Sequence, residues 1–278
     1  MGNVMTNRNR FWGSHLVPLV VLIVTLAPIF LLFLNAVKPS DEFTANPFGL
    51  PSRLTLENIS TAWTMGEYGE AYWNSIIVGV CTVLIVCTAG GLCAYALAKL
   101  EFRGKSLIML LLFLVLSVPM GLFLVPLFYA WIKLNLMDTL QGLILIYSAI
   151  YLPFNIFLLR TYLIGIPKEI SESAKIDGCN ELQIFGKIML PIAKPVFLTV
   201  SLLTGLWTWN EFFFANAFIQ NEDLKTVATK YLVFVGNYSA DWSKISAAGV
   251  ISILPFIVIY FLLQRNFIEG MAEGSIKG

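Results

Sequence analysis

Histidine and closely spaced cysteines are nearly absent from the sequence. His15 is the only histidine, and the four cysteines, Cys81, Cys87, Cys93 and Cys179, lack the close pairings that a zinc site needs. We therefore predict no catalytic residue of the Cys/His type, no metal site and no cofactor bound by this chain.

A complete phosphate-binding loop is also missing. Gly104-Lys105-Ser106 matches the end of such a loop, but Lys99 stands where the motif has its first glycine. The tripeptide also precedes an apolar run, whereas a phosphate-binding loop joins a strand to a helix. We therefore predict that this chain is not an enzyme and does not hydrolyse ATP by itself.

Charge is scarce. Of the 278 residues, 13% are charged and 58% are hydrophobic, and the mean hydropathy is +0.78. A soluble domain of this size presents much of its surface to water, so it has no core large enough for so many apolar side chains. The sequence therefore predicts an all-α protein embedded in a lipid bilayer.

Long apolar stretches support this prediction. A hydrocarbon core of about 30 Å needs about 20 apolar residues per helix. Six stretches qualify, near 16–37, 71–98, 107–132, 139–160, 191–219 and 245–264. No small-x-small cleavage site follows the first, so we expect an uncleaved helix there, and we expect Pro119 and Pro126 to bend or break the third. The fold predicted is six transmembrane helices in a single domain, residues 1–278.

The positive charges predict an orientation. With the N-terminus in the cytoplasm, 12 of the 18 Lys and Arg residues fall in inside segments. The other six are Lys38, Arg53, Lys133, Lys225, Lys230 and Lys244. We therefore expect both termini and the loop 161–190 to be cytoplasmic.

The polar stretch EISESAKIDGCNELQIFGKIMLP, residues 169–191, interrupts the apolar sequence. Pro167 suits a helix start, and Asp177-Gly178 suits a helix that ends in a left-handed turn, which predicts a short helix over 168–177. Asn180 and Gln183 have the spacing of a capping box for a second helix. We expect Leu182, Phe185 and Ile188 or Met189 to share one face of this second helix.

The order of residues in this stretch resembles the EAA loop of ATP-binding-cassette (ABC) importer permeases. The resemblance rests on Glu172-Ser173-Ala174, Asp177-Gly178, Leu190-Pro191 and Pro195. Ser173 and Cys179 stand where the family usually has alanine, and both are small. Further matches at Leu152-Pro153-Phe154, Trp209-Asn210-Glu211-Phe212, Gln264-Arg265 and Gly274 to Gly278 are similar to the carbohydrate permeases, binding-protein-dependent inner-membrane components that include the second maltose permease subunit.

The resemblance implies a type I ABC importer permease whose EAA loop forms a cytoplasmic coupling helix on an ATPase subunit. The coupling residues it implies are Glu172, Ser173, Ala174, Asp177, Gly178 and Phe185. Asp177 and Gly178 also suit a helix end that has no partner, so both interpretations stay open.

The same resemblance implies the partners. They are ABC ATPase subunits that bind ATP and Mg, a second permease that is usually a different chain, an extracytoplasmic solute-binding protein and the bilayer, with no nucleic acid. The location implied is a bacterial or archaeal cytoplasmic membrane.

Polar side chains within the apolar stretches are candidates for the solute pathway. Tyr147, Tyr151 and Asn155 recur at four-residue spacing, so they share one helix face that suits sugar hydroxyls or bonds to neighbouring helices. Trp209 and Asn210 precede Glu211, which is the one acidic residue well inside an apolar run. Burial of a carboxylate in a membrane is costly, so a solute contact and a partner across the permease interface are both consistent with Glu211.

Three functions remain as alternatives to sugar import. They are ABC import of another solute, ion-coupled secondary transport and a membrane scaffold. Secondary carriers often show two similar halves with matched intramembrane charges, and this sequence shows neither. A scaffold has no need of the EAA pattern.

Overall fold

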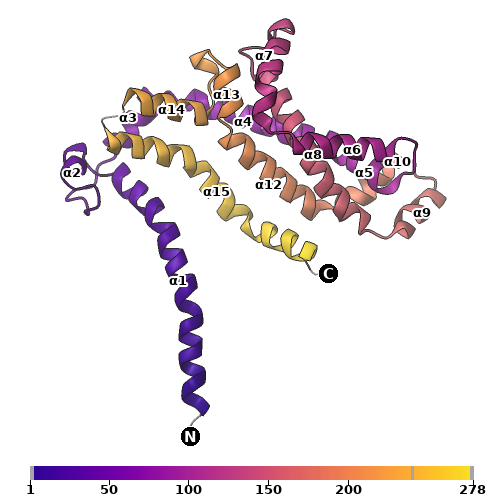
Figure 1. Ribbon diagram of the computed structural model, residues 1–278, viewed down its shortest axis with the longest axis horizontal. Helices are drawn as coiled ribbons and strands as arrows, with labels where there is room; N and C mark the ends of the chain where they lie inside the picture. Colours follow the sequence, from indigo (N-terminus) through magenta and orange to yellow (C-terminus); the bar gives the residue numbers. More distant parts are fainter. Residues whose placement is uncertain (1–2, 239–240, 276–278) are drawn as a thin grey trace. The chain divides into compact units, whose positions relative to one another are not determined.

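The structure, a computed structural model, describes the backbone of residues 3–238 and 241–275 and the side chains of residues 16–238, 241–259 and 261. Every regular element in these residues is a helix (Figure 1). In chain order they are α1 (Asn3–Ala36), α2 (Ser40–Ala45), α3 (Glu57–Met65), α4 (Tyr68–Ile85), η1 (Val86–Gly90), α5 (Gly91–Lys99), α6 (Lys105–Ser117), η2 (Met120–Phe123), α7 (Leu124–Lys133), α8 (Leu140–Ile164), α9 (Lys168–Ile176), α10 (Glu181–Ile184), η3 (Phe185–Met189), α11 (Leu190–Ile192), α12 (Lys194–Asn210), α13 (Phe213–Phe218), η4 (Glu222–Leu224), α14 (Val227–Asn237) and α15 (Trp242–Ser275).

Helices long and apolar enough to cross a membrane make this a multi-pass membrane protein. Within the described part of the chain there are four, Leu16–Ala36, Tyr68–Lys99, Leu140–Ile164 and Trp242–Ile259. Two bent pairs, Lys105–Ser117 with Met120–Lys133 and Glu181–Ile192 with Lys194–Asn210, raise the number to six if each pair is one span.

The predicted third helix, 107–132, is broken at Pro119, as expected. Val118 has an extended backbone, which a following proline favours, and the two arms are bent by 98°. Pro126 does not break the helix. It lies in the first turn of α7, where the 3-10 turn η2 changes to the α-helix.

The prediction of one continuous fifth helix over 191–219 is wrong. An 82° bend separates Glu181–Ile192 from α12, and α12 ends at Asn210. Glu211 then adopts an extended backbone, and the shorter α13 follows. The hydrophobic run is continuous in sequence, so hydropathy gave no sign of this interruption.

The chain divides into two compact units. Unit 1 consists of residues 1–68 and 231–255, and unit 2 of residues 69–230 and 256–278. The single-domain prediction stays a prediction.

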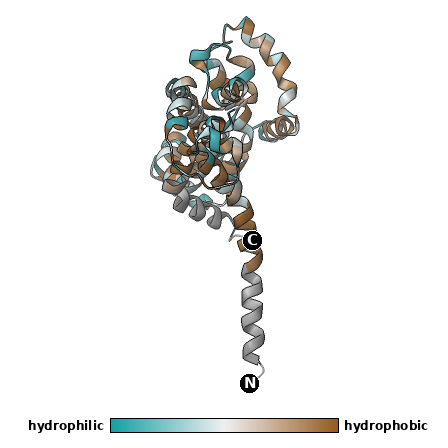
Figure 2. Cartoon of the chain, turned by 90° about the vertical axis from the view of Figure 1, so that its left-hand side faces the viewer, coloured by the Kyte–Doolittle hydropathy of each residue, from teal (hydrophilic) through white to brown (hydrophobic). Residues whose placement is uncertain are grey.

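Unit 2 is built around α8, which packs against α5, η1 and α12. Leu143, Ile146 and Leu159 of α8 are buried in the core. Thr139 caps its start by accepting a hydrogen bond from the Gly142 N–H at 3.0 Å. In the most apolar stretch of α8, 56% of the residues are buried inside the protein. The corresponding share for α1, whose described residues are almost uniformly hydrophobic (Figure 2), is 0%. A helix whose most apolar stretch buries no residue inside its own chain suits contact with lipid.

Unit 1 contains a buried lysine. Lys38 donates hydrogen bonds to the carbonyls of Asn46 at 3.0 Å, Pro47 at 3.3 Å and Gly49 at 2.5 Å, which satisfies the ammonium in place of water. Asn58 donates to the carbonyls of Ala36 and Lys38. These bonds hold the loop between α2 and α3 onto the end of α1.

Candidate functional site: the coupling segment and the polar face of α8

The short helix predicted in the polar stretch is confirmed as α9. It ends in a Schellman-type turn, in which the Cys179 N–H donates to the Ala174 carbonyl and the Gly178 N–H to the Lys175 carbonyl, both at 3.0 Å. Gly178 has φ +83°, the left-handed conformation predicted for it. Only glycine adopts this conformation without strain, so the residue type explains the turn.

The predicted capping box of the second helix is also confirmed. The Gln183 N–H donates to Asn180 Oδ1 and the Asn180 N–H to Gln183 Oε1, both at 2.9 Å. The predicted apolar face is only partly correct. Ile184 and Met189 are fully buried, whereas Leu182, in the α-helical turn before η3, is 71% exposed. The change to the π-helix η3 after this turn alters which of the following residues face the core.

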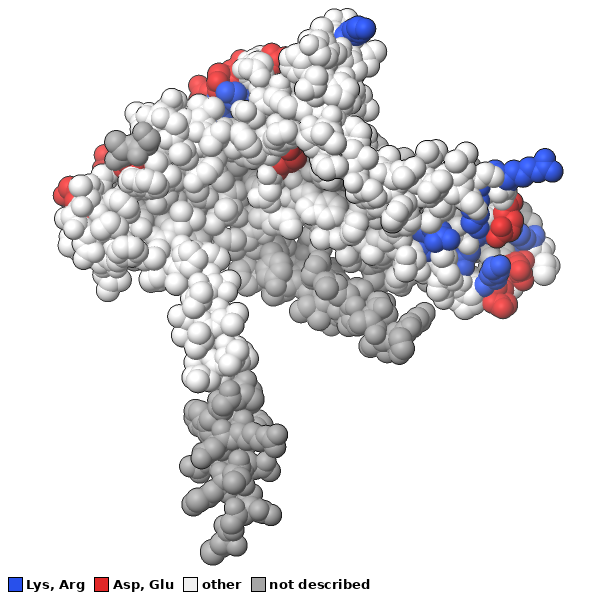
Figure 3. Space-filling model, viewed as in Figure 1, with Lys and Arg blue, Asp and Glu red and all other residues white. Residues whose placement is uncertain are grey.

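The predicted coupling residues lie on two sides of this segment. Glu172, Ser173, Asp177 and Gly178 are exposed. Ala174 is buried, and Phe185 is half-buried, with its ring centroid 5.5 Å from that of Tyr95. Charged side chains gather at this end of unit 2, around α9 and α10, while the helices beyond it are nearly free of charge (Figure 3).

Glu181 is a residue that the sequence did not single out. Its Oε2 accepts a 2.7 Å hydrogen bond from the Tyr95 hydroxyl of α5, and its Oε1 pairs with Lys175 of α9 at 2.7 Å. Lys99 of α5 donates to the Ile166 carbonyl just before α9. The contacts of Tyr95 and Lys99 join residues far apart in sequence, so no local motif predicted them.

The predicted polar face of α8 exists, and it faces α12 and the turn that follows it. Tyr147 and Asn155 are fully buried, and Tyr151 is nearly so. The Asn155 amide donates to the Tyr151 carbonyl at 2.9 Å and to Thr204 Oγ1 of α12 at 3.2 Å. The Tyr147 and Tyr151 rings lie 6.0 Å apart, and Trp207 packs against Tyr151 at 5.4 Å.

Glu211 caps a helix. Its carboxylate accepts hydrogen bonds from the backbone N–H groups of Phe214 at 2.9 Å and Ala215 at 3.1 Å, which lie in the first turn of α13. The Tyr147 hydroxyl donates to the same carboxylate at 2.5 Å. Sequence reasoning identified the residue as unusual and missed this role, because the hydropathy pattern concealed the start of α13.

Trp209 and Asn210 lie apart from this cluster. Trp209 makes an edge contact with Tyr72 of α4 at 5.6 Å, and the exposed Asn210 amide donates to the Leu206 carbonyl of its own helix. The structure therefore brings Tyr147, Tyr151 and Glu211 together and places the other two residues outside them.

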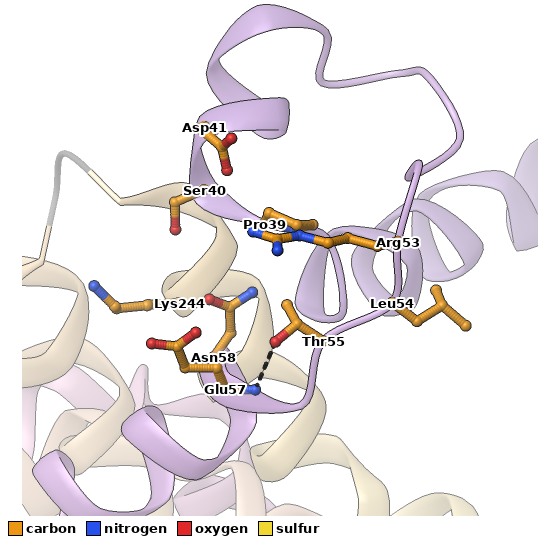
Figure 4. Close-up of a pocket in the computed structure, with 9 residues that line it drawn as sticks. All are labelled: Pro39, Ser40, Asp41, Arg53, Leu54, Thr55, Glu57, Asn58 and Lys244. Atoms are coloured by element: carbon orange, nitrogen blue, oxygen red, sulfur yellow. Dashed lines mark hydrogen bonds between the residues drawn. The ribbon is translucent and has the colours of Figure 1, made fainter.

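A polar pocket of about 370 Å³ lies in unit 1 (Figure 4). Its lining residues are Pro39, Ser40, Asp41, Arg53, Leu54, Thr55, Glu57, Asn58 and Lys244. Both signs of charge are present, and Lys244 is paired with Asp241 at 2.7 Å. Such a lining suits a hydrated surface contact and selects no single ligand class.

Comparisons with known proteins identify the family. A model of the family described as "Binding-protein-dependent transport system inner membrane component" matches residues 87–273. This chain belongs to that family. It is therefore a membrane permease subunit of an ABC importer.

Two relatives are named for oligosaccharides. The diacetylchitobiose uptake system permease protein NgcG of Streptomyces coelicolor is 32% identical, over 95% of this chain and 88% of that protein. The arabinooligosaccharides transport system permease protein AraQ of Halalkalibacterium halodurans is 32% identical, over 93% of each chain.

The fold is also that of a solved structure. A chain of a bacterial ABC transporter involved in the import of the acidic polysaccharide alginate superimposes with a TM-score of 0.82 at 24% identity, covering 94% of this chain and 98% of that one. The family resemblance carried by the EAA-like stretch is thus confirmed. The side chains of the remaining matches, Gln264-Arg265 and Gly274 to Gly278, lie outside the described residues.

Proposed function

We propose that this permease carries a sugar or oligosaccharide into the cell, driven by ATP hydrolysis on partner subunits. The observation that carries the proposal is helix α9, with its exposed side and the left-handed turn at Gly178 that ends it, in a chain of this family. The oligosaccharides named for NgcG and AraQ support the class of solute.

The proposed topology has six spans, with each bent pair crossing the membrane once. Both termini and α9 then lie in the cytoplasm, in agreement with the positive-inside rule. The charges around α9 and α10 suit the aqueous side of that surface (Figure 3).

The proposed coupling surface is the exposed side of α9 and the turn that follows it. Ile176 is 87% exposed and Leu182 is 71% exposed, beside the exposed charges of Glu172 and Asp177. An apolar centre with a polar rim is the usual composition of a protein–protein contact. An ATPase subunit carrying ATP and Mg is the proposed occupant, and its closure would push α9 as a rigid body.

The proposed solute pathway runs along the polar face of α8. The buried side-chain oxygens Ser148 Oγ, Asn155 Oδ1 and Thr208 Oγ1 have no hydrogen-bond partner among the side chains and backbone that the structure describes. Tyr147 and Tyr151 lie on α8, and Glu211 is hydrogen-bonded to Tyr147. We extend the proposed pathway to Trp209 and Asn210, at the end of α12. Hydroxyl and amide groups of this kind match the donors and acceptors of a sugar.

A second permease, expected to be a different chain, would complete the proposed solute pathway. An extracytoplasmic binding protein would deliver the solute to the loops on the proposed outer side. Residues 38–67, 220–238 and 241–244 lie on the proposed outer side and offer polar surface, including the pocket of Figure 4.

Purification and reconstitution test the proposal. We expect the tagged chain, expressed with candidate ATPase, sister permease and binding-protein subunits, to co-purify with the ATPase. In vesicles the complex should take up a labelled oligosaccharide only with ATP and binding protein present. Uptake by this chain alone, driven by an ion gradient, would overturn the proposal, as would the absence of any bound ATPase.

A further inference from the structure

One face of α5 contacts the chain on both sides of α9. Tyr95 and Lys99 are four residues apart on this helix, so their side chains lie on the same face. Lys99 Nζ donates to the Ile166 carbonyl at 2.5 Å, just before α9 begins. The Tyr95 hydroxyl donates to Glu181 at 2.7 Å, at the first residue of α10. The segment that carries α9 is therefore held at both of its ends by a single helix.

The Glu181 contact also includes α9 itself. One oxygen of the carboxylate accepts from Tyr95 and the other pairs with Lys175 in the last turn of α9, each at 2.7 Å. Tyr95 is 3% exposed, so its ring is fixed by packing. A single carboxylate thus links α5, α9 and α10.

Close apolar packing supports these polar contacts. The Phe185 ring lies 5.5 Å from that of Tyr95 and 6.4 Å from that of Phe197. A Cβ at Gly91 of α5 would stand 2.8 Å from the Phe197 ring and 3.3 Å from the Phe185 ring. Because there is no room for a side chain at this position, α5 and the segment after α9 meet too closely to slide independently.

A change in helix geometry separates α5 from the rest of its span. The span Tyr68–Lys99 contains the π-helical turn η1, at Val86–Gly90, directly before α5. Turns of this kind occur frequently at functional sites, and they mark places where helix geometry departs from the regular α form. The departure from α-helical geometry thus lies directly before α5.

We propose that Tyr95 and Lys99 are positioning residues, forming a two-point clamp that transmits displacement of α9 to α5. The inference rests on the proposed function, because it assumes that an ATPase moves α9. It adds a route for that movement through α5, beside the direct chain connections to α8 and α12.

Two conservative variants remove the clamp. Tyr95→Phe deletes the hydroxyl and keeps the ring that packs against Phe185. Lys99→Met deletes the ammonium and keeps a side chain of similar length, while Lys99→Arg retains a donor. The matched controls are Tyr129→Phe and Lys133→Met, at exposed positions of α7. All variants are measured in the complete reconstituted importer, as solute taken up per ATP hydrolysed and as ATPase bound per permease.

We expect Tyr95→Phe and Lys99→Met to bind as much ATPase per permease as the parent and to take up less solute per ATP hydrolysed. Loss of one hydrogen bond should lower the ratio about fivefold in each single variant, and the double variant should fall further. Lys99→Arg and both controls should match the parent. A ratio equal to that of the parent in Tyr95→Phe and Lys99→Met would overturn the clamp, as would a loss of uptake that only follows a loss of assembled complex. If the parent itself binds no ATPase, the proposed function fails and the clamp fails with it. If the parent binds the ATPase and takes up solute, and the two variants match it, only the clamp fails.

Discussion

The hydroxyl of Tyr147 donates a 2.5 Å hydrogen bond to the carboxylate of Glu211, which joins the middle of α8 to the junction of α12 and α13. The same carboxylate accepts from the N–H groups of Phe214 and Ala215. A charge deep in an apolar sequence is thus satisfied by three donors, which explains how it is tolerated there.

Replacement of Glu211 should separate its capping role from its charge. We expect Glu211→Ala to lower both uptake and the melting temperature, because two N–H groups and a tyrosine hydroxyl lose their acceptor, at about 1–3 kcal/mol for each buried group left unsatisfied. Glu211→Gln should have a smaller effect, because the amide oxygen still accepts. Thermal denaturation in detergent and vesicle uptake measure the two effects.

Tyr147→Phe is the matched variant, because it removes one donor and leaves the helix cap intact. It should cost less stability than Glu211→Ala, about 1 kcal/mol. Near-parental uptake and melting temperature in Glu211→Ala would show that the carboxylate is a bystander.

The left-handed residue at the end of α9 offers a second prediction. Gly178→Val should uncouple ATP hydrolysis from uptake while the chain still inserts, because valine at φ +83° carries a strain of about 1–3 kcal/mol and deforms the turn. Gly186→Val is the control, since both glycines face open space and only Gly178 has a positive φ.

A charge reversal tests the same surface without backbone strain. Asp177→Lys should weaken binding of the ATPase at the C-terminal end of α9, because the exposed carboxylate is replaced by a cation. Normal uptake with normal ATPase association in both Gly178→Val and Asp177→Lys would remove the coupling assignment.

Local chemistry was readable from the sequence. The turn at Gly178, the capping box of Asn180 and Gln183 and the break at Pro119 each depend on neighbouring residues with fixed backbone preferences. These features were predicted at the residues where the structure has them.

Contacts between distant residues were not readable in the same way. Tyr95 and Glu181 are 86 residues apart, and Tyr147 and Glu211 are 64 apart. Side-chain periodicity identifies a helix face but does not name the residue that it meets. The start of α13 was hidden for a related reason, because a helix break inside an apolar run leaves the mean hydropathy unchanged.

A pH-dependent stability is expected from the loop before α14. Glu222 accepts from Lys225 at 2.5 Å and from Lys230 at 3.2 Å, and both lysines are buried. The Lys225 hydrogen bond, with a smaller contribution from Lys230, holds the pKa of Glu222 below its usual 4.5, although burial opposes the shift. Because the pKa is lowered on folding, the stabilisation is complete above pH 4.5 and is lost as the pH falls through the lowered value.

The difference in melting temperature between the parent and Glu222→Gln measures this effect. We expect the parent to be the more stable near pH 7 and the difference to shrink in acid. Glu70→Gln, at an exposed position of α4, is the control. A difference that stays constant from neutral pH down to pH values well below 4.5 would contradict the assigned ion pairs.

The start of α8 gives the last prediction. A Cβ at Gly142 would overlap the Leu136 carbonyl oxygen and stand 2.8 Å from Nε1 of Trp131, which itself donates to the Gly142 carbonyl at 3.1 Å. A backbone oxygen cannot move aside as a flexible side chain does, so Gly142→Ala must shift the loop before α8. We expect this variant to lower the free energy of unfolding by about 1–3 kcal/mol, and the melting temperature with it. Gly79→Ala is the control, because a Cβ there meets nothing within 4 Å and alanine favours the helix. If Gly142→Ala and Gly79→Ala have equal melting temperatures, the Leu136 carbonyl does not lie against Gly142 as closely as the structure places it.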